Sequence, residues 1–231
     1  MCKGKQQMKF WKLASVTTAL VLSTSANAAL IERLGGMAYY DDVADLTWLA
    51  DANYSRTQYL NSGGTEGYSN GEMTWGEARN WAADLDVAGV TGWRLPRTQV
   101  PDPSCEYNNY SCTGSEMGNM FYNVLGGIAG YSIYDAPAVT GNLNVYLFDN
   151  LINNDQYFSS TVVDPDATPG LLQAYTFYFG IGNQSVTYAS SPNLAWAVHD
   201  GDISAVPVPA AVWLFGSGLI SLVGFSRRKK S

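Results

Sequence analysis

Two segments of the chain repeat apolar residues with the spacing of an α-helix. The first follows Thr74, which forms a capping-box pattern with Glu77, and it continues to Gly89. The second follows Ser115, a preferred N-cap residue, and stops at the Gly126-Gly127 pair. The apolar positions are Trp75, Ala78, Trp81, Ala82 and Leu85 in the first segment and Met117, Met120, Phe121, Val124 and Leu125 in the second. We therefore predict two helices whose apolar faces belong to the core.

Shorter apolar runs, separated by Gly, Asn, Ser or Pro, have the length and composition of strands. Residues 37–41 and 46–49 flank an Asp-rich turn and predict an opening hairpin. Later runs at 157–163, 174–180, 185–188 and 194–199 predict further strands. The segments 62–71 and 163–170 are rich in turn residues and predict exposed loops. Helices early and antiparallel strands late indicate an α+β domain.

The C-terminal end carries an uncharged apolar run at residues 210–225. As a helix this run would be about 24 Å long, slightly shorter than a hydrocarbon core of about 30 Å. Two motifs flank it, the proline motif Val206, Pro207, Val208 and Pro209 and the basic end Arg227, Arg228, Lys229 and Lys230. The cations favour a cytoplasmic end, and the prolines keep the preceding segment extended and open to proteolysis. These features fit either an ordinary membrane anchor or a tail that is cut at the prolines.

The N-terminal end has the three regions of a secretory signal peptide. Four lysines precede an apolar core at residues 13–22, and Ala26-Asn27-Ala28 forms a cleavage site. Cleavage after Ala28 leaves a chain that begins at Ala29. An uncleaved anchor is the alternative, but the apolar core is too short to favour it. We therefore predict a signal peptide at 1–28, an exported domain at 29–205 and a C-terminal tail at 206–231.

Removal of both ends changes the charge. The whole chain has a formal charge of −7, but residues 29–205 keep five arginines, no lysine and all 20 carboxylates, which gives −15. Such a surface repels nucleic acid and anionic lipid. It is compatible with neutral sugars, cationic partners or divalent cations.

Two cysteines, Cys105 and Cys112, remain in the exported domain. In an oxidising compartment they predict a local disulfide. A metal site is the alternative, although neither a second Cys pair nor a His cluster accompanies them. Between them, Tyr107 and Tyr110 stand among asparagines, a combination suited to sugar stacking and hydroxyl binding as well as to loop packing.

Carboxylates form two small groups along the chain. Asp164 and Asp166 are candidate Ca²⁺ ligands, and so are the three aspartates of the hairpin turn, Asp41, Asp42 and Asp45. Neither group has the loop pattern of a dedicated calcium site, and turn formation explains both. The sequence predicts no cofactor, with Ca²⁺ as the one open option.

Catalytic chemistry has little support in the sequence. His199 is the sole histidine, so catalysis by several histidine ligands is excluded, and a Ser-His-Asp scheme would have to use this residue. A structural histidine at a strand end is the favoured interpretation. For Arg94, in the block Trp93-Arg94-Leu95-Pro96, an ion-paired structural role is favoured over a ligand role. A glycosidase pair needs a carboxylate separation that sequence does not provide.

The tail from Val206 to Lys230 resembles the PEP-CTERM sorting signal, with Val208 where the family motif has Glu. The resemblance implies an exported protein of a Gram-negative bacterium, held transiently in the inner membrane and cut near the prolines by an exosortase. The Sec translocon and signal peptidase are the implied partners at the other end. The expected destination is the cell surface or the extracellular matrix, where exopolysaccharide is made.

Five blocks of the exported domain resemble the Lcl C-terminal domain family, also called DUF1566. They are Asp45-Leu-Thr-Trp-Leu-Ala-Asp-Ala-Asn-Tyr, Thr74-Trp-Gly-Glu-Ala, Gly92-Trp-Arg-Leu-Pro, Tyr157-Phe-Ser-Ser-Thr and Ala195-Trp-Ala-Val. The resemblance implies a compact C-type lectin-like fold with two helices and small antiparallel sheets. Some members of that family resemble surface adhesins that bind sulfated polysaccharide, so the resemblance also implies a surface protein that contacts polysaccharide.

Three hypotheses of function follow from these patterns. The first is a non-catalytic surface or matrix protein whose lectin-like domain binds polysaccharide or another surface component. The second is an enzyme that modifies exopolysaccharide through carboxylates. The third is a structural matrix protein without a discrete ligand.

Overall fold

The computed structural model describes residues 30–164 and 171–203. The predicted signal peptide with Ala26, Ala28 and Ala29, the sorting tail at 206–231 and the candidate ligand Asp166 lie outside these residues. Within the described part of the chain, every helix is too short or too polar to cross a bilayer. The apolar run at 210–225 lies outside the described residues, so this finding does not cover it.

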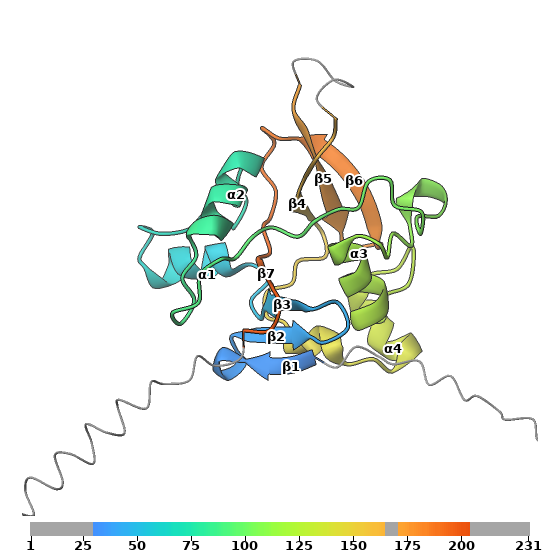
Figure 1. Ribbon diagram of the computed structural model, residues 1–231, viewed down its shortest axis with the longest axis horizontal. Helices are drawn as coiled ribbons and strands as arrows, with labels where there is room; N and C mark the ends of the chain where they lie inside the picture. The colour runs from blue at the N-terminus through green and yellow to red at the C-terminus, as the bar shows by residue number, and fades with distance from the viewer. Residues whose placement is uncertain (1–29, 165–170, 204–231) are drawn as a thin grey trace, which may run out of the picture.

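The first sheet has four antiparallel strands in the order β1-β2-β3-β7 (Figure 1). Their bounds are Leu30–Arg33, Ala38–Asp41, Leu46–Leu49 and Val198–Asp200. The predicted hairpin is therefore confirmed as β2 and β3. Asp41 explains its tight turn, because the buried carboxylate accepts hydrogen bonds from the backbone N–H groups of Val43 and Ala44 at 3.0 and 3.1 Å.

The second sheet has three antiparallel strands in the order β4-β5-β6. They comprise Gln156–Val162, Gln173–Tyr178 and Asn183–Tyr188, close to three of the predicted runs. The fourth run, 194–199, is only partly a strand, because β7 begins at Val198. The preceding residues are extended and bond to both sheets: Phe158 N–H donates to the Leu194 carbonyl at 2.9 Å, and Leu49 N–H to the Ala197 carbonyl at 3.1 Å.

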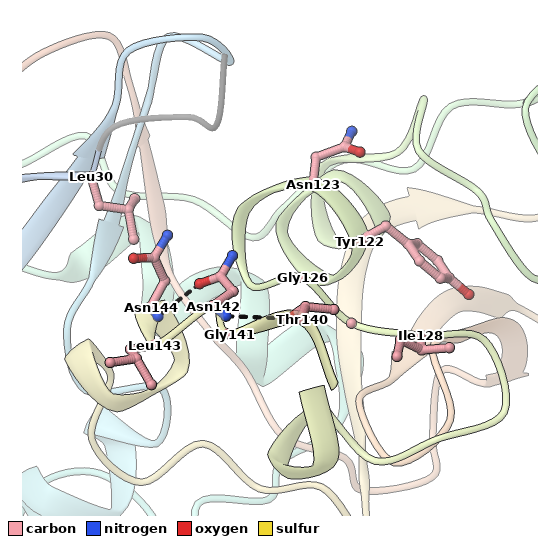
Figure 2. Close-up of a pocket in the computed structure, with 11 residues that line it drawn as sticks. Leu30, Tyr122, Asn123, Gly126, Ile128, Thr140, Gly141, Asn142, Leu143 and Asn144 are labelled. Carbon is pink, nitrogen blue, oxygen red and sulfur yellow. Dashed lines mark hydrogen bonds between the residues drawn. The ribbon is translucent and has the colours of Figure 1, made fainter. Parts of the chain in front are cut away.

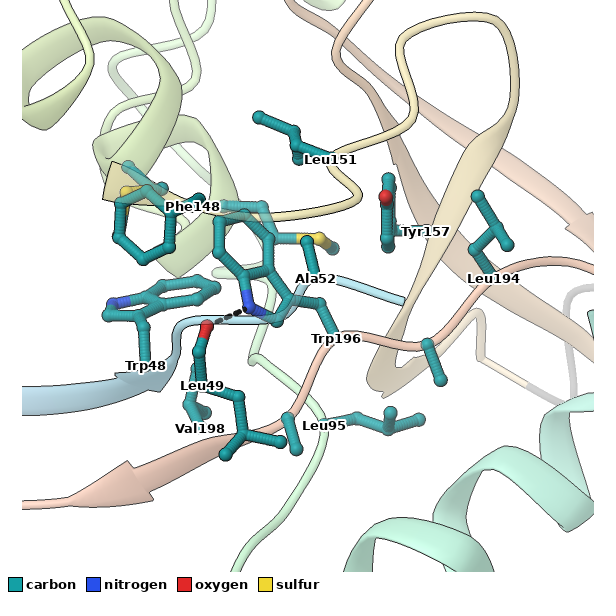
Figure 3. Packing of buried hydrophobic residues seen from close by; sticks show 14 of the residues in the cluster. Trp48, Leu49, Ala52, Leu95, Phe148, Leu151, Tyr157, Leu194, Trp196 and Val198 are labelled. Carbon is teal, nitrogen blue, oxygen red and sulfur yellow. Dashed lines mark hydrogen bonds between the residues drawn. The ribbon is translucent and has the colours of Figure 1, made fainter. Parts of the chain in front are cut away.

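Trp196 lies at the centre of the core, where this segment passes between the sheets (Figure 3). Its ring meets Trp48 at 4.8 Å and Phe148 at 5.1 Å in edge-to-face contacts. Its indole N–H donates to the Leu49 carbonyl at 2.8 Å. The same ring lies 6.1 Å from Tyr157 of β4 and 5.7 Å from Phe179, which follows β5, so one side chain joins strand β3 to the second sheet.

The predicted helix after Thr74 is α2, Trp75–Asp84. Glu77 accepts hydrogen bonds from the Thr74 N–H at 2.8 Å and from its hydroxyl at 2.7 Å, so the predicted start is confirmed. The predicted end at Gly89 is wrong. Leu85 adopts an extended backbone, and Val87 and Val90 exchange backbone hydrogen bonds around a tight turn, which buries Leu85 and Val87 in the core instead of extending the helix.

The segment after Ser115 is helical as predicted, but it changes its winding. An α-helical turn, α3 at Glu116–Asn119, continues into a π-helical turn, η3 at Met120–Val124. Leu125 N–H donates to the Met120 carbonyl five residues earlier, at 2.9 Å. All five predicted core residues are buried. Ser115 stands at the N-cap, yet its hydroxyl donates to Asp102 rather than accepting from the helix.

The α+β class is therefore confirmed, but the described residues contain four α-helices rather than the two that the sequence predicted. The additional ones are α1, Tyr54–Asn61, and α4, Ala136–Thr140. Short 3₁₀ turns connect the elements: η1 Leu34–Gly36, η2 Tyr107–Asn109, η4 Ile133–Asp135 and η5 Asn144–Leu147. In Figure 1, α1 and α2 lie to one side of the molecule, and α3 and α4 to the other.

Candidate functional site

The two cysteines form the predicted disulfide. The Sγ atoms of Cys105 and Cys112 lie 2.08 Å apart, and residues 105–112 form the disulfide loop. Asp102 anchors its base, because the carboxylate accepts from the Ser104 N–H and the Ser115 hydroxyl, each at 3.0 Å. The disulfide therefore closes the loop, and the hydrogen bond between Ser115 and Asp102 attaches the base of the loop to the start of α3.

The two candidate tyrosines of the disulfide loop have different environments. Tyr107 is 87% exposed, whereas Tyr110 is half-buried. The Asn108 carbonyl accepts from the Asn183 side chain at 2.7 Å, which fixes the loop against strand β6. Asn108 and Asn109 both have φ of 59°, a conformation that asparagine tolerates better than most residues. The loop therefore presents one aromatic ring to solvent on a fixed base.

Tyr122, on the π-helical turn, connects the disulfide loop to the rest of the site. Its hydroxyl donates to the Gly182 carbonyl at 2.6 Å. Burial raises the pKa of Tyr122, and the nearby Tyr110 and Glu106 raise it further, although hydrogen bonding with Ser111 opposes them. The phenol therefore stays neutral at physiological pH, with its hydroxyl end beside the disulfide loop.

Tyr122 also lines a recess of about 770 Å³ that opens between η3 and the chain after α4 (Figure 2). We call it the amide recess, because Asn123, Asn142 and Asn144 supply its polar side chains together with Thr140. No pattern in the sequence predicted this recess. Its only signals were the alternating asparagines at 142 and 144 and the adjacent glycines at 126 and 127, which come together only through the fold.

Of the candidate calcium ligands, the structure describes Asp164 and the three aspartates of the hairpin turn. Asp164 is exposed after the end of β4, and Asp41 is occupied with its turn. Over the described ranges, a single group of three metal-ligating side chains comes within 4.8 Å, namely Asp102, Cys105 and Cys112. Both of its sulfur atoms belong to the disulfide, so they do not offer the thiolates that bind metals.

Arg94 has the structural role that the sequence favoured. Its guanidinium donates to both oxygens of Glu116 at 2.7 and 2.8 Å and also pairs with Asp200. Burial opposes the charge, but these two carboxylates raise the pKa of Arg94 above its ordinary value. The network joins β7 to α3 and leaves this arginine occupied with protein partners.

His199 lies on β7, the edge strand of the first sheet. It is half-buried and packs edge-on against Trp93, with ring centroids 5.8 Å apart. Its Nδ1 atom is buried and has no hydrogen-bond partner within residues 30–164 and 171–203. The described residues therefore place no carboxylate where a triad would need one to orient the imidazole.

The chain matches no family model, no curated protein and no solved structure.

Proposed function

We propose that this chain is an exported, non-catalytic surface or matrix protein that binds polysaccharide. The observation that carries the proposal is Tyr107, whose ring is 87% exposed on a loop closed by a disulfide and fixed to β6. An exposed aromatic ring on a rigid base loses little conformational entropy on binding and offers a face for a sugar ring. The neighbouring asparagines supply groups that bond hydroxyls.

The finer architecture belongs to the same proposal. The two small antiparallel sheets and the short helices are compatible with a compact C-type lectin-like domain, and the sequence blocks resemble the Lcl C-terminal domain family. The proposal extends over residues 29–205. Arg94 is ion-paired with Glu116 and Asp200, and His199 packs against Trp93, which supports a binding role rather than a catalytic one.

The proposed route follows from the two ends of the chain. The Sec translocon and signal peptidase would process residues 1–28, and an exosortase would act at the PEP-CTERM-like tail after a transient stay in the inner membrane. Deletion of residues 206–231 is then expected to release the protein into the medium, as measured by immunoblotting of culture supernatants. Retention of the truncated protein in the cell envelope would contradict this role of the tail.

Glycan-array binding by the full chain in mild detergent tests the proposed function. Tyr107→Ala should abolish or strongly weaken binding, with and without Ca²⁺, because the substitution removes the exposed face without touching the core. Tyr188→Ala is the matched control, since this tyrosine is 47% exposed at the other end of β6 from the loop contact. Equal loss in both variants, or no glycan binding by the parent chain, would refute the proposal.

The alternative hypothesis, that the chain is an enzyme that modifies exopolysaccharide, predicts a different result in the same samples. A catalyst would shorten or modify the bound glycan over time, and single carboxylate substitutions would abolish that turnover. Chromatography of the recovered glycans distinguishes the two. We expect the glycans to be recovered unchanged.

A further inference from the structure

The floor of the amide recess is built from one shared carbonyl. The side-chain N–H groups of Asn142 and Asn144 both donate to the Val124 carbonyl at 2.9 Å, and the Asn142 side-chain oxygen accepts from the Asn144 N–H at 2.9 Å. Val124 is the last residue of η3, and the last carbonyls of a helix have no partner within it, so this one is available to the two asparagines. The amides are therefore held in place before any ligand arrives.

Gly126 lets the two walls of the recess approach each other. It has φ of 72°, and a Cβ atom there would lie 2.9 Å from Asn142 Cβ and 3.1 Å from Thr140 Oγ1. Any larger residue would push the chain after α4 away from η3. The absence of a side chain at this position thus sets the width of the recess.

Asn123 and Asn144, which both line the recess, keep unused hydrogen-bonding capacity. The side-chain oxygens of Asn123 and Asn144 accept no hydrogen bond from the residues that the structure describes, and each amide retains a second N–H. Donors and acceptors therefore stand side by side, which is the pattern that hydroxyl groups require. Leu30, Ile128 and Leu143 add apolar surface to the same recess.

The recess carries no formal charge. Tyr122 is its one ionisable lining residue among those described, and the remaining lining side chains are amides, a hydroxyl, aliphatic groups and glycines. The exported domain around it has five arginines against 20 carboxylates. An acidic sugar would therefore meet no cation in the recess and would be repelled by the surrounding surface. A hydroxylated, uncharged ring meets neither penalty.

We infer that the amide recess binds one uncharged sugar residue of the polysaccharide, as a second contact beside the disulfide loop that presents Tyr107. The inference rests on the proposed function, because it names the ligand class of a further subsite. The volume of the recess, about 770 Å³, suits such a ligand, since ligand pockets of proteins typically measure roughly 300–1,000 Å³. Tyr122 belongs to both contacts, with one side in the recess and its hydroxyl end next to Ser111.

Isothermal titration of the full chain in mild detergent tests the inference. The probes are neutral oligomers (β-glucan, mannan and N-acetylglucosamine) and the acidic oligogalacturonate. The double substitution Asn123→Ala/Asn144→Ala removes the two uncommitted amide oxygens, and Asn142 still satisfies the Val124 carbonyl. We expect about a tenfold loss of affinity for the neutral oligomer that binds, from two hydrogen bonds of ordinary strength. We also expect no binding of oligogalacturonate.

Asn61→Ala/Asn154→Ala is the matched control, because both amides are exposed outside the recess. Circular dichroism melts of both double variants show whether the fold is retained. Affinity for the neutral oligomer should also be nearly constant between about 0.05 and 0.5 M NaCl, since no charge pair is involved.

The outcomes separate this inference from the proposed function. If a neutral oligomer binds and depends on Tyr107 but not on Asn123 and Asn144, the recess inference is overturned and the proposed function stands. If oligogalacturonate binds as tightly as the neutral oligomers and the recess variant loses it, the ligand class is wrong. If no oligomer binds at all, both proposals fail.

Discussion

Trp196→Phe is the substitution that tests most directly how the two sheets are held together. The change removes the donor to the Leu49 carbonyl, worth about 1 kcal/mol, and about three ring atoms from a fully buried position, worth about 2 kcal/mol more. The smaller ring also weakens or loses the contacts with Trp48 and Phe148. We therefore expect a loss of about 3 kcal/mol in the free energy of unfolding.

Urea denaturation of the parent and the variant, followed by circular dichroism, measures this loss. Trp81→Phe is the control, because this half-buried indole donates to the side chain of Gln58 and not to a buried backbone carbonyl, and its loss should cost about 1 kcal/mol or less. The slopes of the two transitions must agree for the difference to report stability. A cost below 1 kcal/mol for Trp196→Phe, or a cost equal to that of Trp81→Phe, would refute the central role of Trp196.

Three further perturbations probe other parts of the fold. Gly126→Ala should destabilise the protein by about 1 to 3 kcal/mol, because the new Cβ would meet Asn142 at 2.9 Å at a φ of 72°; an unchanged thermal midpoint would contradict the close approach. The paired substitution Cys105→Ser/Cys112→Ser should cost about 2 kcal/mol in thermal or urea unfolding, whereas a cost near zero would mean that the hydrogen bonds of Asp102 and Asn183 hold the loop without the disulfide. Hydrogen bonds from Arg94, and more weakly from Arg97, lower the pKa of Asp200. The carboxylate therefore contributes to the stability of the fold above its unfolded pKa of about 3.9, and this contribution is lost as the pH falls through the pKa of the folded state. Asp200→Asn should therefore reduce the loss of unfolding free energy between about pH 4 and pH 2 by about 0.5 kcal/mol or less, because the carboxylate is 60% exposed. Thermal melts at each pH measure this, and a steeper loss of stability in the variant would contradict the expected direction.

Local signals predicted the elements whose sequence pattern and tertiary role agree. The capping pair Thr74 and Glu77 located the start of α2, and the Asp-rich turn located the β2-β3 hairpin. The helix α1 gave no such signal, because Ser55 is its one buried residue and its other side chains show no apolar face. Helix α1 is therefore stabilised by its surroundings rather than by its own pattern.

The misplaced boundaries and the missed recess have tertiary causes. The end of α2 was overestimated because Leu85 has helical spacing, yet it reaches the core from an extended backbone. The disulfide and Tyr107 could be proposed from neighbouring residues in the sequence. The amide recess could not, because the Val124 carbonyl and the asparagines at 142 and 144 are brought together across about twenty residues by hydrogen bonds that no periodicity reveals.

The segment from Leu194 to Asp200 also constrains when the chain can fold. It supplies Trp196 to the centre of the core and the strand β7 to the first sheet, and it is among the last described residues to be synthesised. Before it emerges from the ribosome, β3 lacks its neighbour and the aromatic cluster lacks its middle member. The nascent domain therefore has no complete core to fold around during most of its synthesis. The export that we propose would thread the protein through a membrane channel as an extended chain. Such a chain would benefit from that delay, because the residue that completes its core is among the last described residues to be synthesised.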